Sequence, residues 1–354
     1  MKSKHLSIIS FIGLIVSCAG QTARQVSLAN DIVMNYWDNY EPTMTMDLRI
    51  EGEEQYYPKP FRYDFEQKDG VINREVYVST NKNMQNATKY TTNKAFVDIE
   101  NLYMDTNYYV RVDEVGADKT AKGKVEKIHT AEYPRTLKVE GVSNTRDLGG
   151  YKTTDGKRVT QGKVYRGANV DGVRPEGLET MVDKLGIKTD LDLRGIGEGT
   201  AGTVSPLGIN YVNVSGAMYL YGEMGLINFS GEEAFKNEIL TFTNPDNYPI
   251  YFHCAVGRDR TGTLGMVLLA LLGVDSDTIL KEYELSFLST SGNSGMPNVF
   301  NMLAYAEETL GYIVMAGQEN PKDSLAKCTE NWLIDYIGVT KDDINAIKKE
   351  LLTK

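Results

Sequence analysis

Cysteine and histidine are scarce in this chain: three of each occur among 354 residues. The histidines, cysteines and carboxylates show no metal-binding spacing such as CxxC or HExxH, so neither a metal nor another cofactor is expected. Two cysteines, Cys254 and Cys328, lie in the main part of the chain. A disulfide between them is conceivable in an exported protein. We expect instead a reactive Cys254, which follows His253, and a buried, inert Cys328.

Long hydrophobic runs are also absent. The run over residues 6–16 follows two lysines and is too short to span a bilayer, which is typical of a secretory signal. The stretch Ile15–Cys18 resembles the lipobox of bacterial lipoproteins, in which the cysteine is lipidated and becomes the first mature residue. We therefore expect a signal peptide over residues 1–18 and an exported lipoprotein, periplasmic or on the cell surface, anchored to a membrane through Cys18. The alternative is ordinary cleavage one or two residues further on, with Cys18 discarded.

Basic residues are outnumbered by acidic ones. Lysine and arginine total 38 against 48 for aspartate and glutamate, a formal net charge of −10. Proteins that hold nucleic-acid backbones need basic surfaces, so a general nucleic-acid binder is excluded. A local basic pocket for a phosphorylated ligand is compatible with this balance. The length suits about two domains.

The first of these domains has the pattern of an all-β fold. Residues 19–41 read as a polar tether, and residues 42–132 show short alternating runs separated by turns, which indicates an antiparallel sandwich. Leu102, Thr106 and Tyr108 have the spacing that, in fibronectin type III domains, lets a tyrosine hydroxyl bond back to upstream backbone. The segment thus resembles a small immunoglobulin/fibronectin III-like sandwich, although Met104 stands where that family usually has proline.

The second domain, residues 134–354, alternates strand-like and helix-like stretches. This pattern predicts an α/β domain with a central, largely parallel sheet flanked by helices. The apolar run Gly262–Leu272 predicts a helix buried against that sheet.

The stretch "YFHCAVGRDRTGTLG" joins a predicted strand to this helix through a short loop. Unpaired amides in such a loop, together with a helix N-terminus, form a site for an anion. Cys254 comes immediately before the loop. The expected phosphate-binding residues are Ala255, Val256, Gly257, Arg258, Asp259 and Arg260.

The residue types in this stretch suit phosphoryl transfer. Cys254 would be the nucleophile, because amides and a helix N-terminus lower the pKa of a thiol. Arg260 offers a planar fork for two phosphoryl oxygens, and Gly257 permits the left-handed backbone of a tight loop. Thr261 lies where its hydroxyl could bond the departing sulfur. His253 is expected to fix the loop and tune the thiol rather than to act as a base.

The stretch resembles the HCxxGxxRTG signature of cysteine-dependent protein tyrosine phosphatases. It is most similar to the bacterial branch with HCxxGKDRTG, whose members hydrolyse phosphotyrosine and often phosphoserine/threonine or phosphoinositides. The resemblance runs from about Pro134 to Leu352 and implies a tyrosine-phosphatase-like α/β fold. Three positions depart from the branch, where serine, lysine and aspartate are more common: Gly167, Arg258 and Glu282. Four charged residues of the matching segments are expected to form buried ion pairs that brace the loop: Arg146, Asp147, Asp192 and Arg194.

The general acid is open between two residues. Many tyrosine phosphatases carry it as an aspartate on an upstream loop, yet residues 195–245 contain no aspartate, and of their glutamates only Glu223 sits in a loop of plausible reach. Asp259 is preferred, because the branch assigns this role to the equivalent loop aspartate. Its alternative role is structural, as a partner of Arg258 or a helix cap.

The expected function is hydrolysis of phosphotyrosine in proteins or peptides through a cysteinyl-phosphate intermediate. Phosphoserine and phosphothreonine are further expected substrates, as in the branch that the chain resembles. The alternative is a phosphoinositide or inositol-phosphate phosphatase that uses the same loop. A third hypothesis is a non-catalytic lipoprotein that binds a phospho-ligand or a glycan. Cys254 and Arg260 argue against it, because a pure binder needs no nucleophile.

Overall fold

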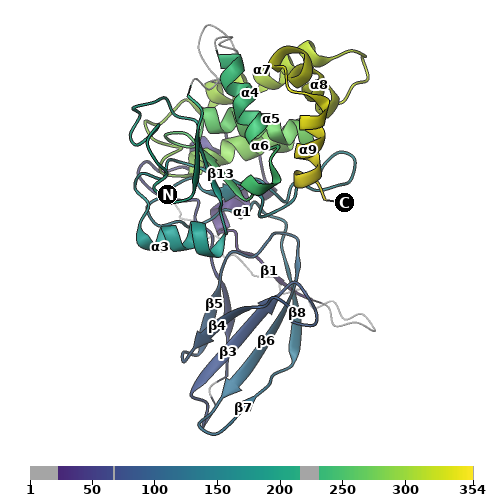
Figure 1. Ribbon diagram of the computed structural model, residues 1–354. Helices are drawn as coiled ribbons and strands as arrows, with labels where there is room; N and C mark the ends of the chain where they lie inside the picture. The colour runs from purple at the N-terminus through teal and green to yellow at the C-terminus, as the bar shows by residue number, and fades with distance from the viewer. Residues whose placement is uncertain (1–22, 67, 216–230, 354) are drawn as a thin grey trace, which may run out of the picture.

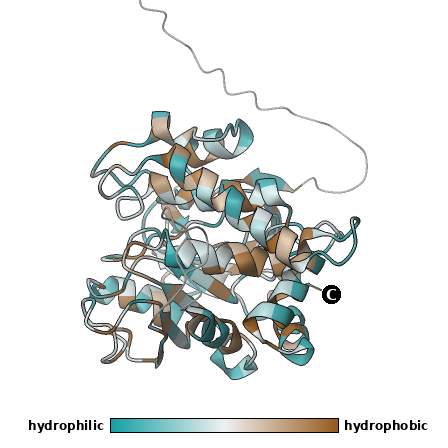
Figure 2. Cartoon of the chain, turned by 90° about the horizontal axis from the view of Figure 1, so that it is seen from above, coloured by the Kyte–Doolittle hydropathy of each residue, from teal (hydrophilic) through white to brown (hydrophobic). Residues whose placement is uncertain are grey.

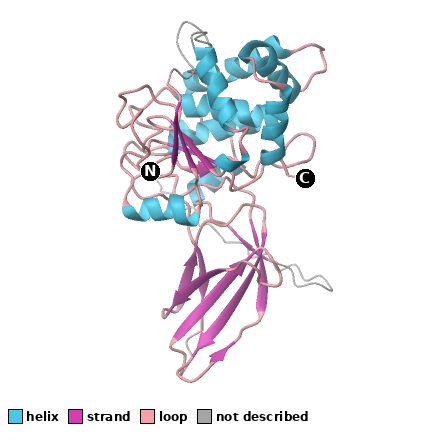
Figure 3. Ribbon diagram, viewed as in Figure 1, coloured by secondary structure: helices cyan, strands magenta, loops and turns pink. Residues whose placement is uncertain are grey.

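The computed structural model describes residues 23–66, 68–215 and 231–353. They form an all-β domain and an α/β domain (Figure 1, Figure 3). The expected signal peptide with Cys18, and Glu223, lie outside the described residues. No helix within the described ranges is long and apolar enough to cross a membrane.

The all-β domain contains two sheets. The larger has the order β1-β8-β6-β3-β4, with β7 paired to β6, and the smaller consists of β2 and β5. Alternate residues of β3 and β6, among them Val76 and Val110, point into the core between the two sheets. The strands are β1 (Arg24–Val26), β2 (Phe61–Asp64), β3 (Asn73–Ser79), β4 (Thr88–Thr92), β5 (Phe96–Ile99), β6 (Asn107–Val115), β7 (Thr120–Ala121) and β8 (Val125–Thr130).

The hydroxyl of Tyr108 makes the backbone contact that its spacing predicts. It accepts a hydrogen bond from the amide of Tyr103 at 2.8 Å. Membership of the fibronectin III family stays a prediction.

The segment expected to be a tether is folded for most of its length. Arg24–Val26 pairs in parallel with β8, and helix α1 (Asp31–Asp38) follows, capped by the side chain of Asn30. The helix packs on the α/β domain, where the buried Tyr36 donates a hydrogen bond to the carbonyl of Lys281 at 2.8 Å. The physical reason is the spacing of Val33 and Tyr36, which puts both on one face of the helix.

The all-β domain also begins later than the predicted sandwich. Residues 42–60 hold no strand of either sheet; they contain the short helix α2 (Thr45–Leu48) and run along the α/β domain. The amide and hydroxyl of Thr45 both donate to the buried carboxylate of Glu284, at 2.9 and 2.8 Å. Tyr56 is fully buried and its hydroxyl accepts from Arg146 at 3.0 Å. This segment therefore belongs structurally to the second domain.

The α/β domain is built on a five-stranded sheet of order β12-β11-β13-β10-β9. All pairings are parallel except that of β9, in agreement with the predicted largely parallel sheet. Most of the helices lie on one side of this sheet, and loops lie on the other (Figure 3). The strands are β9 (Arg146–Asp147), β10 (Val164–Gly167), β11 (Thr189–Asp192), β12 (Asn210–Asn213) and β13 (Ile250–His253). The helices are α3 (Pro175–Leu178), α4 (Glu232–Thr241), α5 (Arg260–Leu272), α6 (Ser276–Glu284), α7 (Val299–Gly317), α8 (Leu325–Trp332) and α9 (Lys341–Leu351).

Helix α5 is the central helix of this domain. All its residues are buried, as the apolar run predicts, and it ends at Gly273 with a left-handed φ of 92°. The surrounding helices carry both hydrophobic and hydrophilic residues (Figure 2). The central strand β13 therefore delivers its last residues directly to the N-terminus of a buried helix.

Candidate active site

The predicted loop lies between the end of β13 and the start of α5. Cys254 is 2% exposed, and Asp259 and Arg260 are each 8% exposed. Gly257 has φ +74°, and a Cβ there would lie 2.4 Å from the backbone of Gly167. Only glycine satisfies both restrictions, so the loop can close tightly against β10.

The outer side of the loop is fixed by hydrogen bonds to its carbonyl groups. Planar peptide units whose oxygens are held outward turn the following amides to the inner side, where they can bind an anion. Three side chains supply these bonds: Asn169 Nδ2 to Ala255 O at 2.7 Å, Asn144 Nδ2 to Val256 O at 3.0 Å, and Arg166 Nη2 to Gly257 O at 3.0 Å.

A buried ion-pair cluster braces the same loop from behind. Arg146 and Arg166 contact the two oxygens of Glu282 at 2.5 and 2.7 Å, and all three side chains are fully buried. Burial alone raises the pKa of Glu282, but the two guanidinium groups outweigh it and bring the pKa below its usual range. Two of the expected bracing residues, Arg146 and Asp147, thus take buried ion pairs, the latter with Arg135 at 2.7 Å.

Gly167 explains one departure from the signature of the branch. A Cβ at this position would lie 2.3 Å from the hydroxyl of Tyr251. That hydroxyl donates to the carbonyl of Ala168 at 2.6 Å. The tyrosine therefore takes the space that a serine side chain would need.

The thiol of Cys254 is tuned toward its anionic form. Burial raises the pKa of this thiol. The hydroxyl and amide of Thr261 and the charge of Arg260 lower it by more, so the net pKa is below the ordinary value. Among the described residues the Thr261 hydroxyl has no partner with regular hydrogen-bond geometry, so it is free to act on the thiol.

His253 is fully buried and points at carboxylates. Its Nε2 lies 2.9 Å from Oδ1 of Asp190, although the two groups are not aligned as a regular hydrogen bond. Its Nδ1 lies 3.1 Å from the carbonyl oxygen of Cys254. Burial lowers the pKa of the imidazole, but the contact with Asp190 outweighs it and raises the pKa above the usual value. These contacts fit a residue that holds the loop.

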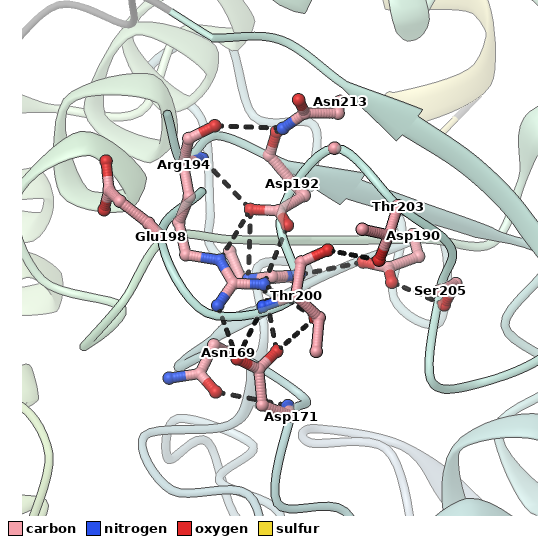
Figure 4. Close-up of polar contacts among 12 residues, drawn as sticks. Asn169, Asp171, Asp190, Asp192, Arg194, Glu198, Thr200, Thr203, Ser205 and Asn213 are labelled. Carbon is pink, nitrogen blue, oxygen red and sulfur yellow. Dashed lines mark hydrogen bonds and ion pairs between the residues drawn. The ribbon is translucent and has the colours of Figure 1, made fainter. Parts of the chain in front are cut away.

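The second pair of bracing residues anchors a neighbouring loop (Figure 4). Arg194 contacts Asp192 through Nε at 2.9 Å and Asp171 through Nη1 at 2.8 Å. Asp171 in turn accepts from the hydroxyl of Thr200 at 2.7 Å. Residues 195–200, which follow β11, are thereby held beside the catalytic loop.

Glu198, on that loop, is a contact that sequence reasoning missed. Its two oxygens accept from Nη1 and Nη2 of Arg260 at 3.0 and 2.8 Å. Arg260 also donates to the carbonyl of Leu193 at 3.1 Å. The sequence holds one signal for it, since Glu198 comes four residues after Arg194, at the same edge of the sheet.

Asp259 is the ion-pair partner of the preceding residue, Arg258. Its oxygens accept from Nε and Nη2 of Arg258 at 3.0 and 3.2 Å, and Arg258 also donates to the carbonyl of Gly292 at 2.8 Å. The structural role expected as the alternative for Asp259 is thus present in the described conformation. It does not conflict with proton donation, since a bound phosphate can recruit Arg258.

Glu238 is a second group that sequence reasoning did not select. It lies on α4, is fully buried, and its Oε1 has no hydrogen-bond partner among the described atoms. Burial raises its pKa well above the usual value, and it interacts electrostatically with Arg260 and Cys254. Burial therefore favours the protonated form of this carboxyl group, which lies near Cys254 and Arg260.

Cys328 is fully buried on α8, and burial raises the pKa of its thiol. Neither Cys254 nor Cys328 is in a disulfide. Within the three described ranges, no group of three or more histidine, cysteine or carboxylate side chains is arranged to hold a metal ion.

A family model described as "Tyrosine phosphatase family" matches residues 137–353, more than half of the chain. The chain belongs to the tyrosine phosphatase family. The matched region contains the complete loop and every residue that braces its carbonyl groups.

The individual relatives share a third or less of their aligned residues with this chain. The "putative tyrosine-protein phosphatase" of Cupriavidus necator is 31% identical over an alignment of 172 positions, and the match covers 42% of this chain and 61% of that protein. Two structures of the catalytic core of Siw14, one described as a PP-IP phosphatase of S. cerevisiae in complex with citrate, share 17% identity. They cover 45% and 49% of this chain and 83% and 86% of theirs, with TM-scores of 0.29 and 0.30. A likeness of that size says nothing about the substrate of this family member.

Proposed function

We propose that this chain hydrolyses phosphate monoesters through a cysteinyl-phosphate intermediate. One arrangement carries the proposal: a thiol with a lowered pKa begins a loop whose carbonyl groups are held outward and which ends at Arg260. Inward amides and a guanidinium are the groups that stabilise the charge of a transferring phosphoryl group.

The reaction has two steps. The Cys254 sulfur attacks phosphorus, an S–P bond forms, the bond to the leaving oxygen breaks, and that oxygen takes a proton from a carboxylic acid. A water molecule then attacks phosphorus, its proton returns to the carboxylate, and the S–P bond breaks to release inorganic phosphate and the thiolate. The chemistry consumes one water and needs no cofactor.

Asp259 is our proposed general acid. It is nearly buried and sits in the loop itself, immediately before Arg260. A dianionic substrate can draw Arg258 toward its own oxygens, which would release Asp259 from its ion pair. Glu223 is the alternative, and it lies outside the described residues.

The proposed substrates are phosphotyrosine proteins or peptides. Arg258, where the branch usually has lysine, favours the second candidate, a phosphoinositide or inositol phosphate, because a guanidinium can bind a further phosphate in a bidentate way. A non-catalytic binder is disfavoured by the lowered pKa of Cys254, which a binder does not need.

We also propose that the protein is an exported lipoprotein attached to a membrane through Cys18. The support is the lipobox-like end of the N-terminal apolar run. Incorporation of labelled palmitate by the wild type and its loss in Cys18→Ala would support the anchor. Labelling of both chains alike would refute it.

Turnover of p-nitrophenyl phosphate tests the central proposal. The purified chain should hydrolyse it, orthovanadate should inhibit the reaction, and Cys254→Ser should abolish it. Cys328→Ser is the matched control, because that buried cysteine lies on α8, away from the loop, and its loss should leave turnover intact. Turnover that survives in Cys254→Ser would contradict the mechanism.

A further inference from the structure

The segment before the sandwich runs beside the catalytic loop. Two of its residues donate to backbone carbonyl groups of residues 288–297. The backbone amide of Gln55 donates to Leu288 O at 3.1 Å, and Nη1 of Arg49 donates to Pro297 O at 2.9 Å. Arg258 of the catalytic loop donates to Gly292 O in the same stretch. Residues 289–297, here called the 289–297 loop, thus connect Arg49 with the active site.

Arg49 and Arg258 both donate to carbonyl groups of the 289–297 loop, so two cations contact one short segment. Burial lowers the pKa of Arg49, and the charge of Arg258 lowers it further. Arg258 has Asp259 as an ion-pair partner, whereas Arg49 contacts no carboxylate in the described parts of the chain. Like charges placed together and only partly neutralised are costly unless an anion joins them.

Two side chains on or against the 289–297 loop carry buried polar atoms without partners. Asn293, in the middle of the 289–297 loop, is 3% exposed, and neither its Oδ1 nor its Nδ2 has a hydrogen-bond partner among the described residues. The Nε of Arg49 is buried and likewise unpartnered there. Buried polar groups normally find partners, so the unused donors Asn293 Nδ2, on the loop that both guanidinium groups contact, and Arg49 Nε point to a bound anion.

We propose that Arg49, Arg258 and Asn293 form a second anion site, which takes a further phosphate of the substrate molecule whose scissile phosphate lies in the catalytic loop. This rests on the proposed function and narrows it to compact molecules with two neighbouring phosphate monoesters. A phosphorylated cyclitol has this chemistry, free or as a lipid headgroup. Arg258 serves both sites, because it belongs to the catalytic loop and also reaches the 289–297 loop.

Calorimetric binding to the full-length Cys254→Ser chain tests the site without depending on turnover. Inositol 1,4,5-trisphosphate carries neighbouring phosphates, and inositol 1-phosphate is the matched probe with one phosphate. Arg49→Gln should weaken trisphosphate binding about tenfold, the effect of losing one charge-assisted contact, and should weaken monophosphate binding much less. Arg62→Gln, which removes an exposed arginine of the sandwich, should change neither. Equal losses for both probes, or no loss, would overturn the proposal.

Two further arms separate the possible outcomes. Arg49→Lys keeps the charge and should retain part of the trisphosphate affinity, whereas a purely structural role predicts the same loss for lysine and glutamine. Vesicles of phosphatidylcholine with phosphatidylinositol 4,5-bisphosphate, compared with the free trisphosphate, show whether the phosphates come from a lipid. If the wild type hydrolyses p-nitrophenyl phosphate and Arg49→Gln shows no probe preference, the second site fails while the phosphatase proposal stands. If trisphosphate binding depends on Arg49 but no phosphate ester is hydrolysed, the second anion site stands and the phosphatase proposal fails.

Discussion

Glu198 holds both terminal nitrogens of Arg260, at 3.0 and 2.8 Å. A phosphoryl group needs the same two nitrogens, so substrate binding must displace the glutamate or share the guanidinium with it. Hydrogen bonding with Arg260 lowers the pKa of Glu198, which therefore remains an anion through the neutral range. In the described conformation the carboxylate competes with substrate.

Removing this competitor should tighten anion binding. Glu198 is partly exposed, so the pair is worth no more than about 1 kcal/mol. Glu198→Gln should lower the inhibition constant of orthovanadate two- to fivefold, by roughly that free energy. Glu233→Gln, on the exposed side of α4, is the control. Weaker vanadate inhibition would show instead that Glu198 orients Arg260 for the substrate.

Thr261 should control the reactivity of Cys254. Because its hydroxyl and amide lower the pKa of the thiol, Thr261→Val should move the pH midpoint of iodoacetamide alkylation upward. The wild type should react with a midpoint below that of an ordinary thiol. Thr309→Val removes another buried hydroxyl, one that bonds the carbonyl of Tyr305, and should leave the midpoint unchanged. An identical midpoint in Thr261→Val would assign the tuning to backbone amides and Arg260.

The general acid should reveal itself through the leaving group. Asp259→Asn should lower turnover about a hundredfold or more on phenyl phosphate, whose leaving group needs a proton. The loss on p-nitrophenyl phosphate should be much smaller, because p-nitrophenolate leaves without one. Equal losses on the two substrates would move the role to Glu223 or to water.

The bracing cluster should matter for stability more than any surface pair. Glu282→Gln leaves Arg146 and Arg166 buried without their anion, which should cost about 3–5 kcal/mol of unfolding free energy in urea. The folded-state pKa of Glu282 is lowered, so its stabilising contribution is present above the unfolded value and is lost as the pH falls. Glu75→Gln, which breaks the more exposed pair with Lys89, should cost far less. Equal costs would contradict the bracing role.

The sequence predicts the position of the Cys254–Arg260 loop between a strand and a helix, because the loop is local. A strand, a glycine turn and a helix start follow one another in a single stretch, so the residue order itself sets the positions of Cys254 and Arg260. The parallel sheet follows from the alternation of strands and helices in the same way. The sequence did not predict helix α1, because only two of its residues are buried and the neighbouring sequence is polar.

Contacts made across the fold are not encoded in this way. The approach of Glu198 to Arg260 depends on how Arg194 fixes residues 195–200 against Asp171, a contact 23 residues away in the chain. The position of Arg49 beside Arg258 depends on the whole path of residues 42–60 over the second domain. Composition and spacing leave such approaches undetermined, since tertiary packing sets them.

Glu238 should make stability fall as the pH rises. Its folded-state pKa is raised by burial, so between its unfolded value and that raised value the folded chain binds a proton that the unfolded chain releases. Each step upward in pH within this window therefore lowers the unfolding free energy. Glu238→Gln keeps the shape of the neutral acid and removes the titration.

Urea unfolding of the two chains from pH 5 to pH 8 measures this contribution directly. The difference in unfolding free energy, variant minus wild type, should increase steadily with pH, because every other titrating group is common to both chains. Glu233→Gln, an exposed glutamate of the same helix, should give a flat difference. A flat difference for Glu238→Gln as well would mean that the buried carboxyl is ionised in the folded chain, stabilised by the positive charge of Arg260.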